Sequence, residues 1–223
     1  MKYLILLFGL LTVQCHAPKK KETSAYCEKC KIISAVCMER YDMDNNYKHL
    51  DTALIYINKA LLSCNKEKKK YFTLRKLAVL SMKKDFDQAL VVIKNMDTTY
   101  FYAFPYFNNL LKNRFIAMKA QSENKIIVRD SALRISIIEI GKFLTVNKLK
   151  IDSLLQHKNV NDVFSNPLST AFTEYYYYKS IIEGSEKVKQ EISNKQRQIN
   201  GNEEYFKYVN EFLSQDFMVF IGI

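Results

Sequence analysis

The sequence predicts an all-α protein, and three observations support that prediction. The 223 residues include only five glycines and three prolines, so turns and helix breaks are scarce. Apolar residues make up 48% of the chain, which excludes general disorder. Apolar side chains recur three and four positions apart in most segments, which is the spacing of amphipathic helices. We therefore expect long helices joined by short connections.

The first 15 residues, MKYLILLFGLLTVQC, have the pattern of an export signal. One lysine precedes an apolar run from Tyr3 to Val13, which is too short to span a bilayer comfortably. Three outcomes remain open: lipidation of Cys15, cleavage after Ala17 without a lipid, and retention as an anchor. The ending at Cys15 resembles a bacterial lipoprotein signal. That resemblance implies a lipid on Cys15 and a membrane-anchored lipoprotein of the bacterial cell envelope, with a soluble secreted or periplasmic protein as the alternative.

Residues 16–23 are expected to form a basic linker that contains Lys19, Lys20 and Lys21. These lysines would rest on anionic headgroups if Cys15 carries a lipid, or simply be solvated. The whole chain has 34 basic and 23 acidic side chains, for a formal charge of +11. Because the chain is expected to be exported and its charges are dispersed, we expect an acidic protein or peptide partner and no nucleic acid.

Residues 24–146 predict about three antiparallel helical hairpins. Residues 24–41 and the segment HLDTALIYINKALLSC, which begins at His49, would form the first. The second lies in residues 74–97, where one amphipathic helix ends near Lys83 and another begins after Asp85. The turn between these two helices is so short that they must fold back on each other.

In the second hairpin, Phe86 opens the second helix, Ala89 is a small residue three positions later, and Ile93 follows as a large apolar residue. This pattern resembles the tetratricopeptide repeat (TPR) family. Ala53 of the first hairpin lies 36 residues before Ala89, close to the family period of about 34 residues. The glycine and tryptophan usual in the family's first helix are absent. The resemblance implies an α-α superhelix of stacked hairpins that binds proteins or peptides.

The third hairpin is expected over residues 104–123 and 126–144, with Ala132 as the small inner residue. Residues 147–223 would form a C-terminal helical capping region. There we expect a short helix in IDSLLQH, a loop that ends at Pro167, one long helix from about Ser169 to Ile199, and a final helix. That final helix, EEYFKYVNEFLSQDFMVFI, carries an apolar stripe that would cover the end of the array.

The chain has one cysteine constellation: Cys27, Cys30 and Cys37 fall on one face of the first helix, and Cys64 ends the second. Two interpretations remain open, namely small side chains packed against the neighbouring helix and a disulfide, for which the first candidate joins this helix to Cys64. Neighbouring cysteines on a regular helix pair poorly. A zinc site would need a second cysteine pair or nearby histidines, and we expect no metal.

Two aromatic clusters are candidates for partner binding. The segment TEYYYYK places Tyr175, Tyr176, Tyr177 and Tyr178 around one helix, and they cannot all be buried because successive residues point about 100° apart. The segment YFYAFPYF adds Tyr102 and Tyr106 at the start of the third hairpin. Tyrosine is favoured at interfaces for its apolar body and polar tip, although these rings would also fill gaps between helices.

No phosphate loop, nucleophile elbow or zinc-protease helix occurs, so we expect neither an enzyme nor a cofactor. The function predicted is a non-catalytic protein- or peptide-binding scaffold, anchored in the cell envelope. The alternative is a structural envelope lipoprotein whose helical array only spaces a C-terminal interaction module from the membrane.

Overall fold

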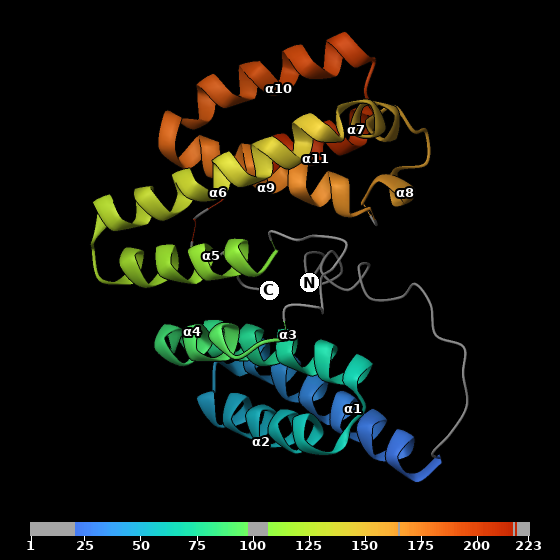
Figure 1. The fold of residues 1–223 in the computed structure, drawn as a ribbon, viewed down its shortest axis with the longest axis vertical. Coiled ribbons are helices and arrows are strands. Elements are labelled where there is room, and N and C mark those ends of the chain that lie inside the picture. Colours follow the sequence, from blue (N-terminus) through green and yellow to red (C-terminus); the bar gives the residue numbers. More distant parts are fainter. Residues whose placement is uncertain (1–20, 98–106, 165, 216, 218–223) are drawn as a thin grey trace. The chain divides into compact units, whose positions relative to one another are not determined.

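The computed structural model describes residues 21–97, 107–164, 166–215 and 217. Those residues form eleven helices and contain no strand, which confirms the predicted all-α class. Their contacts divide them into two compact units, one made of the first four helices and the other of the remaining seven (Figure 1).

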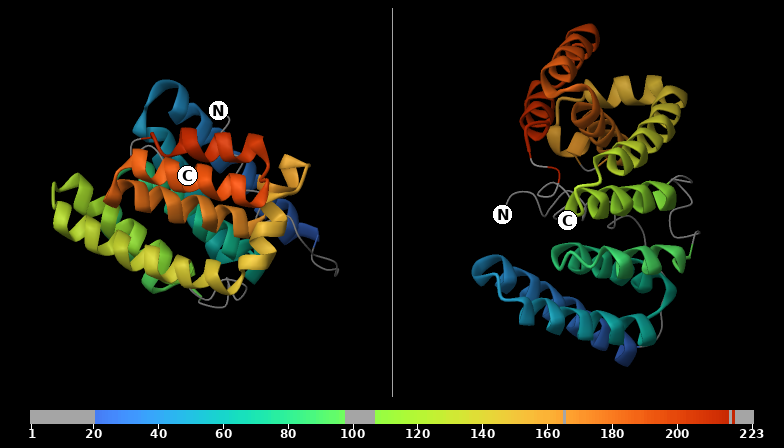
Figure 2. Two further views of the ribbon diagram at one scale, coloured as in Figure 1. Left: turned by 90° about the horizontal axis from the view of Figure 1, so that it is seen from above. Right: turned by 90° about the vertical axis from the view of Figure 1, so that its left-hand side faces the viewer.

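The N-terminal unit consists of α1 (Lys21–Asp44), α2 (Tyr47–Ser63), α3 (Lys66–Met82) and α4 (Phe86–Lys94). Helix α1 packs on α2 as an antiparallel hairpin, α2 packs on α3, and α3 on α4 (Figures 1 and 2). Helix α2 is the centre of this unit. Its inner face consists of Leu50, Ala53, Ile57 and Ala60, which are completely buried.

The seven helices of the C-terminal unit are α5 (Phe107–Ser122), α6 (Ile126–Val146), α7 (Lys148–Leu155), α8 (Val160–Phe164), α9 (Pro167–Glu183), α10 (Ser185–Ile199) and α11 (Glu203–Phe212). Helix α6 packs on α5 along one side and on α9 along another. Gly141 permits the second contact, because a Cβ there would lie 3.3 Å from the ring of Tyr175 on α9. Helices α7, α8 and α10 also pack on α9, and α11 packs on α8 and α10.

Left-handed residues close most of the hairpin turns. Asn45, Lys84, Asn124 and Asn200 have φ between 49° and 57°, and Gly184 has φ 94°. After three of these residues the next backbone N–H donates to the carbonyl five positions earlier, which satisfies the helix C-terminus. The three pairs are Asp85 to Leu80 at 2.9 Å, Lys125 to Ala120 at 2.7 Å, and Gly201 to Gln196 at 2.9 Å. These caps explain why such short turns suffice.

Side-chain caps start several helices. Asn46, Asn65, Asp85, Asn166 and Asn202 each accept a hydrogen bond from a backbone N–H in the first turn of the helix that follows. Pro167 stands at the first position of α9, where its missing N–H costs nothing.

The long helix predicted from Ser169 to Ile199 is wrong. The chain breaks at Gly184 into α9 and α10, and these two helices pack against each other. The φ of 94° at Gly184 is unfavourable for residues with a Cβ, so this glycine ends α9 and reverses the chain. In the stretch predicted as a loop before Pro167, the structure contains the short helix α8.

The third predicted hairpin, α5 with α6, shares its core with the C-terminal helices. The boundary between the two units falls between α4 and α5, whereas we predicted one array over residues 24–146. The reason is that α6 is aliphatic on several sides, so it packs on α9 as well as on α5. Helix α11 ends at Phe212 and packs on α8 and α10. Its Tyr205, Phe206 and Val209 are buried, and the rings of Tyr205 and Phe206 lie near that of Phe172 on α9.

Candidate functional site

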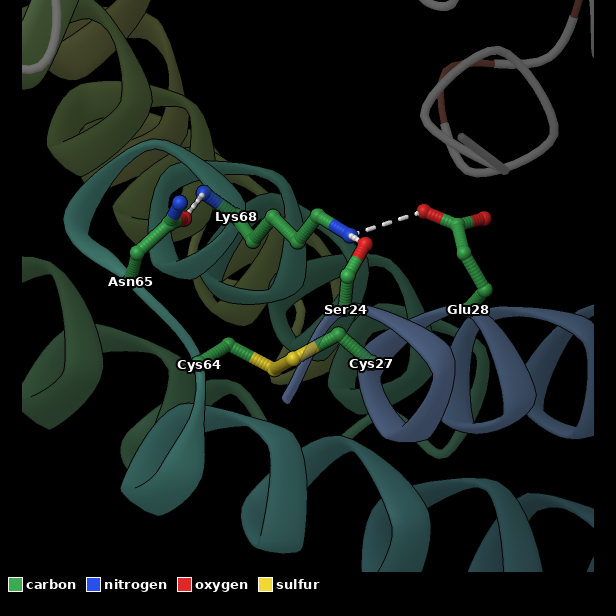
Figure 3. Close-up of a disulfide and its surroundings, with 6 residues drawn as sticks. All are labelled: Ser24, Cys27, Glu28, Cys64, Asn65 and Lys68. Carbon is green, nitrogen blue, oxygen red and sulfur yellow. Dashed lines mark hydrogen bonds and ion pairs between the residues drawn. A yellow bond between two sulfur atoms is a disulfide. The ribbon is translucent and has the colours of Figure 1, made fainter. Parts of the chain in front are cut away.

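The cysteine face of α1 connects this helix covalently to the end of α2. Cys27, near the start of α1, forms a disulfide with Cys64, the C-cap of α2, and their Cα atoms are 6.1 Å apart (Figure 3). Lys68 of α3 lies over the same end of the hairpin, where its Nζ is 3.0 Å from Glu28 Oε1 and 3.4 Å from Ser24 Oγ. The disulfide therefore closes the hairpin at the end opposite its turn.

Cys30 and Cys37 are free thiols buried on the same face of α1. Burial raises the pKa of the Cys37 thiol, which lowers the fraction present as reactive thiolate. Across the parts of the chain that the structure describes, no three His, Cys, Asp or Glu side chains gather closely enough to hold a metal ion. The free thiols thus contribute as small apolar side chains packed against α2.

Arg75 of α3 is a buried cation that the sequence pattern did not reveal. Its Nη1 donates to the backbone carbonyl of Lys31 at 3.0 Å and to Ser34 Oγ at 3.3 Å, both on α1. The guanidinium also lies 5.0 Å from the centre of the Tyr71 ring. Burial lowers the pKa of Arg75. This side chain fastens α3 to α1, and its partner 44 positions away leaves no local signal.

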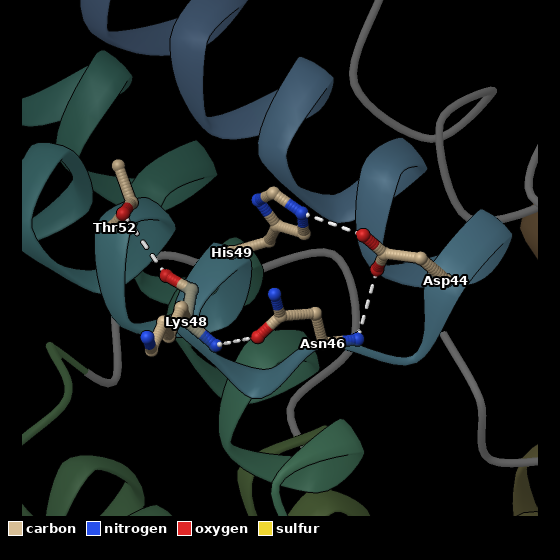
Figure 4. Close-up of polar contacts among 5 residues, drawn as sticks. All are labelled: Asp44, Asn46, Lys48, His49 and Thr52. Carbon is tan, nitrogen blue, oxygen red and sulfur yellow. Dashed lines mark hydrogen bonds and ion pairs between the residues drawn. The ribbon is translucent and has the colours of Figure 1, made fainter.

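The turn between α1 and α2 holds a small polar cluster (Figure 4). Asp44 Oδ1 accepts from the backbone N–H of Asn46 at 2.8 Å, and its Oδ2 is 2.9 Å from His49 Nε2. The hydrogen bond from the Asn46 backbone has the largest effect on Asp44, and the contact with His49 adds to it. Together they hold the pKa of Asp44 below its ordinary value despite some desolvation. Asn46 in turn accepts from the N–H of Lys48 at 3.1 Å. The cluster stabilises the start of α2.

The four consecutive tyrosines of α9 divide into two pairs. Tyr177 and Tyr178 are buried in the core of the C-terminal unit, so these two proposed partner-binding residues cannot reach a partner. Tyr177 donates to the carbonyl of Gln215 at 3.2 Å. Tyr175 and Tyr176 are half-buried, and burial raises the pKa of Tyr176 to about 12. Only this second pair keeps ring surface for a partner.

Tyr178 belongs to a buried ionic group that joins α5 to α9. Arg114 of α5 donates through Nε to the Tyr178 hydroxyl at 3.0 Å and forms an ion pair with Glu174 of α9 through Nη2. Burial alone would lower the pKa of Arg114, but the carboxylate and the phenol oxygen together raise it above its ordinary value. Burial also raises the pKa of Tyr178. The group therefore joins α5 to α9 through one hydrogen bond and one ion pair.

Several helices expose aliphatic side chains, and α1 and α6 each carry more than two of them. On α1, Ile32 and Met43 are 61% and 80% exposed, and Val36 lies between them. On α6, the exposed aliphatic residues are Ile126, Ile127, Val128, Ile135, Ile138 and Val146. Contiguous exposed apolar surface of this kind marks interaction sites in soluble domains. These two faces are the candidate functional surfaces of the molecule.

Three of the predicted site residues, Cys15, Tyr102 and Tyr106, lie outside the described residues. Among the helices that are described, none is both long enough and apolar enough to cross a membrane. In comparisons with known proteins, no family model, curated protein or solved structure matches this chain.

Proposed function

We propose that this protein is a non-catalytic protein- or peptide-binding scaffold, built of TPR-like helical hairpins and anchored in a bacterial cell envelope by a lipid on Cys15. The packing of helices in adjacent pairs supports a hairpin scaffold. Ala53 and Ala89, the small residues of the resemblance, are completely buried, which supports their role in close helix packing. The envelope location rests on the N-terminal signal.

The observation that supports binding most directly is the outer face of α1, which we call the α1 stripe: Ile32, Val36 and Met43. The three residues are spaced four and seven positions apart, so they lie along one line of about 16 Å. The opposite face of α1 is the cysteine face that packs in the core. A hairpin array buries apolar faces by adding helices, and the α1 stripe is suited to receive one more from a partner.

The charges beside the α1 stripe favour a protein partner. Exposed Lys29 and Arg40 lie on this side of α1 together with exposed Glu39. Charges of both signs around an apolar centre are the usual composition of a protein interface rim. The two buried arginines, Arg75 and Arg114, each donate to a neighbouring helix, and this supports a binding role over a catalytic one.

A crosslinking experiment tests the partner-binding face. A photoreactive p-benzoylphenylalanine at Ile32 should yield a discrete crosslinked product in cell envelopes, and the same group at exposed Lys84 on the α3–α4 turn should not. Once the product is identified by mass spectrometry and purified, Ile32→Glu should weaken its binding at least tenfold, because a charge would enter the apolar contact. If neither Ile32 nor Met43 crosslinks to a protein, the spacer alternative is favoured.

The anchor has its own test, which is the intact mass of the mature protein extracted from membranes. The proposal requires a chain that begins at Cys15 and carries the mass of attached acyl chains. A chain that begins after Ala17 without added mass would show a soluble exported protein. The same sample, measured with and without reduction and alkylation, counts the thiols that are free.

A further inference from the structure

Helix α6 carries a second exposed face, of different chemistry from the α1 stripe. We call it the α6 stripe: Ile127, Ile135, Ile138 and Val146. Ile127 and Val146 at its ends are 84% and 85% exposed. At 100° per residue the four side chains fall within an arc of about 100°, and they extend for about 28 Å along the helix. Leu149, 84% exposed, follows at the start of α7.

Cations outnumber carboxylates on and directly beside this arc. Lys142 is exposed and projects within the arc, and exposed Arg134 lies about 20° beyond one of its edges. Helix α6 has two carboxylates: Glu139 lies about 20° beyond the other edge of the arc, and Asp130 lies about 60° outside it. Asp130 is paired with Arg129 at 2.6 Å, and Glu139 accepts from Asn109 of α5 at 3.4 Å.

Glu183 at the end of α9 is an acidic neighbour of Arg134, whose positive charge helps to lower the pKa of Glu183. Glu183 already accepts a hydrogen bond from Lys187 at 2.6 Å. Past the end of α6, exposed Lys148 and Lys150 add two more positive charges beside Leu149. The stripe is therefore an aliphatic line with cations on and around it.

We propose that the α6 stripe docks, lying in the plane of the interface, on an anionic membrane surface. Aliphatic side chains interleaved with Lys and Arg are the composition of helices that rest at the headgroup boundary. Anionic headgroups attract such lysines and arginines, while the apolar side chains enter the acyl boundary. The stripe lies on a single convex helix, which a bilayer accepts along its whole length without a matching groove.

A second copy of the chain is a poorer occupant. In a two-fold pairing of α6 with itself around Ile138, Arg134 would face the partner's Lys142. The arc itself holds no carboxylate, and Glu139 just outside it accepts from Asn109 of α5. An acidic protein would satisfy the charges but would need a groove about 28 Å long to receive the helix. The inference goes beyond the proposed partner binding, because it concerns another unit and does not depend on the α1 stripe.

The test exploits the absence of tryptophan from the chain. The full-length protein is reconstituted into vesicles that contain brominated lipids, which quench tryptophan fluorescence at the acyl boundary. One variant carries Ile138→Trp, and the control carries Gln190→Trp at an exposed position on α10. The N-terminal segment is the same in both variants, so a difference between them reports which face docks.

We expect strong quenching of the tryptophan at 138 in vesicles with phosphatidylglycerol, little in phosphatidylcholine alone, and little at position 190 in either. Adding Lys142→Gln to Ile138→Trp should lower the ratio of docked to undocked protein by roughly fivefold. High salt should act in the same direction. Circular dichroism checks that the variants keep their helices.

Three results would overturn the proposal. One is equal quenching, or none, at positions 138 and 190. Another is a blue shift of the tryptophan at 138 that grows with protein concentration without vesicles, which would indicate a second copy. The last is shielding of position 138 only when a soluble protein partner is added.

Discussion

Removing the Cys27–Cys64 disulfide should destabilise the N-terminal unit far more than removing a free thiol. The bond closes a loop with a sequence separation of 37. In the chain-entropy description, a loop of this length lowers the entropy of the unfolded chain by about 13 cal/mol/K, which stabilises the fold by about 4 kcal/mol at 25 °C. Measured losses for native disulfides are typically 2–4 kcal/mol. We therefore expect Cys27→Ala with Cys64→Ala to cost about 2–4 kcal/mol.

Hydrogen exchange followed by mass spectrometry locates the effect. Amides of α1, α2 and α3 should exchange roughly 30-fold faster or more in the double variant, because local opening becomes easier. Peptides from α9 in the C-terminal unit serve as the internal reference and should keep their rates. Reduction of the wild-type protein with dithiothreitol should reproduce the change.

The matched control is Cys30→Ala, which removes a buried thiol from the same helix face without opening a loop. It should cost about 1 kcal/mol, the ordinary cost of a small loss of packing. The reasoning is refuted if the double variant loses no more than this control, or if dithiothreitol leaves the exchange of α1 and α2 unchanged.

Three further predictions concern single side chains. Asp44→Ala should lower the urea midpoint at pH 7. Because the pKa of Asp44 is depressed in the fold, its contribution is full above the ordinary carboxyl pKa of 3.8, declines below it, and vanishes only below the folded-state pKa; a difference between the two proteins that persists in strong acid would contradict this. Lys84→Gly should raise the free energy of unfolding by about 0.5–1 kcal/mol, since φ is 57° there, whereas Lys83→Gly in the right-handed region should lower it. Glu174→Ala should lower the free energy of unfolding by about 3–5 kcal/mol, because Arg114 would stay charged and buried without its partner. Replacing both partners with apolar residues should restore most of that loss. A double variant as unstable as the sum of the single variants would argue against this account.

The helices of the N-terminal unit were largely predictable because their apolar residues mark one side. Ala53 and Ile57 of α2 and Phe86 and Ala89 of α4 recur at helical spacing, and all are buried. Helix α6 is different. It carries aliphatic residues on most of its circumference, so spacing alone does not say which side faces α5 or α9 and which stays exposed. Its membership of the C-terminal unit depends on contacts with α9, a helix formed more than 20 residues later.

The break at Gly184 was missed for a local reason. A single glycine inside a helical pattern is tolerated at a modest cost, so glycine alone does not require a break. What decides it is the gain from packing α10 back on α9, where Lys179 and Glu191 form an ion pair across the two helices. This gain is tertiary and does not appear in the local sequence.

The burial of the tyrosines and the partners of the buried arginines could not be predicted for the same reason. Geometry requires that four consecutive tyrosines differ in exposure, but which two are buried depends on Arg114, 64 positions before Tyr178. Arg75 likewise finds its carbonyl partner on α1. The exposed α1 and α6 stripes were also not distinguished from core-facing residues, since isoleucine and valine are equally usual in both places.

The position of the Cys27–Cys64 bond also decides how tension would travel along the chain. Because it joins the start of α1 to the end of α2, a pull from a lipid on Cys15 would enter at Cys27 and pass through the sulfurs directly to α3. The residues between the two cysteines, which would extend by about 130 Å if fully stretched, are excluded from that path. If Cys15 is lipidated as proposed and a partner holds the other end of the chain, the first hairpin would stay folded under forces that extend the rest of the chain.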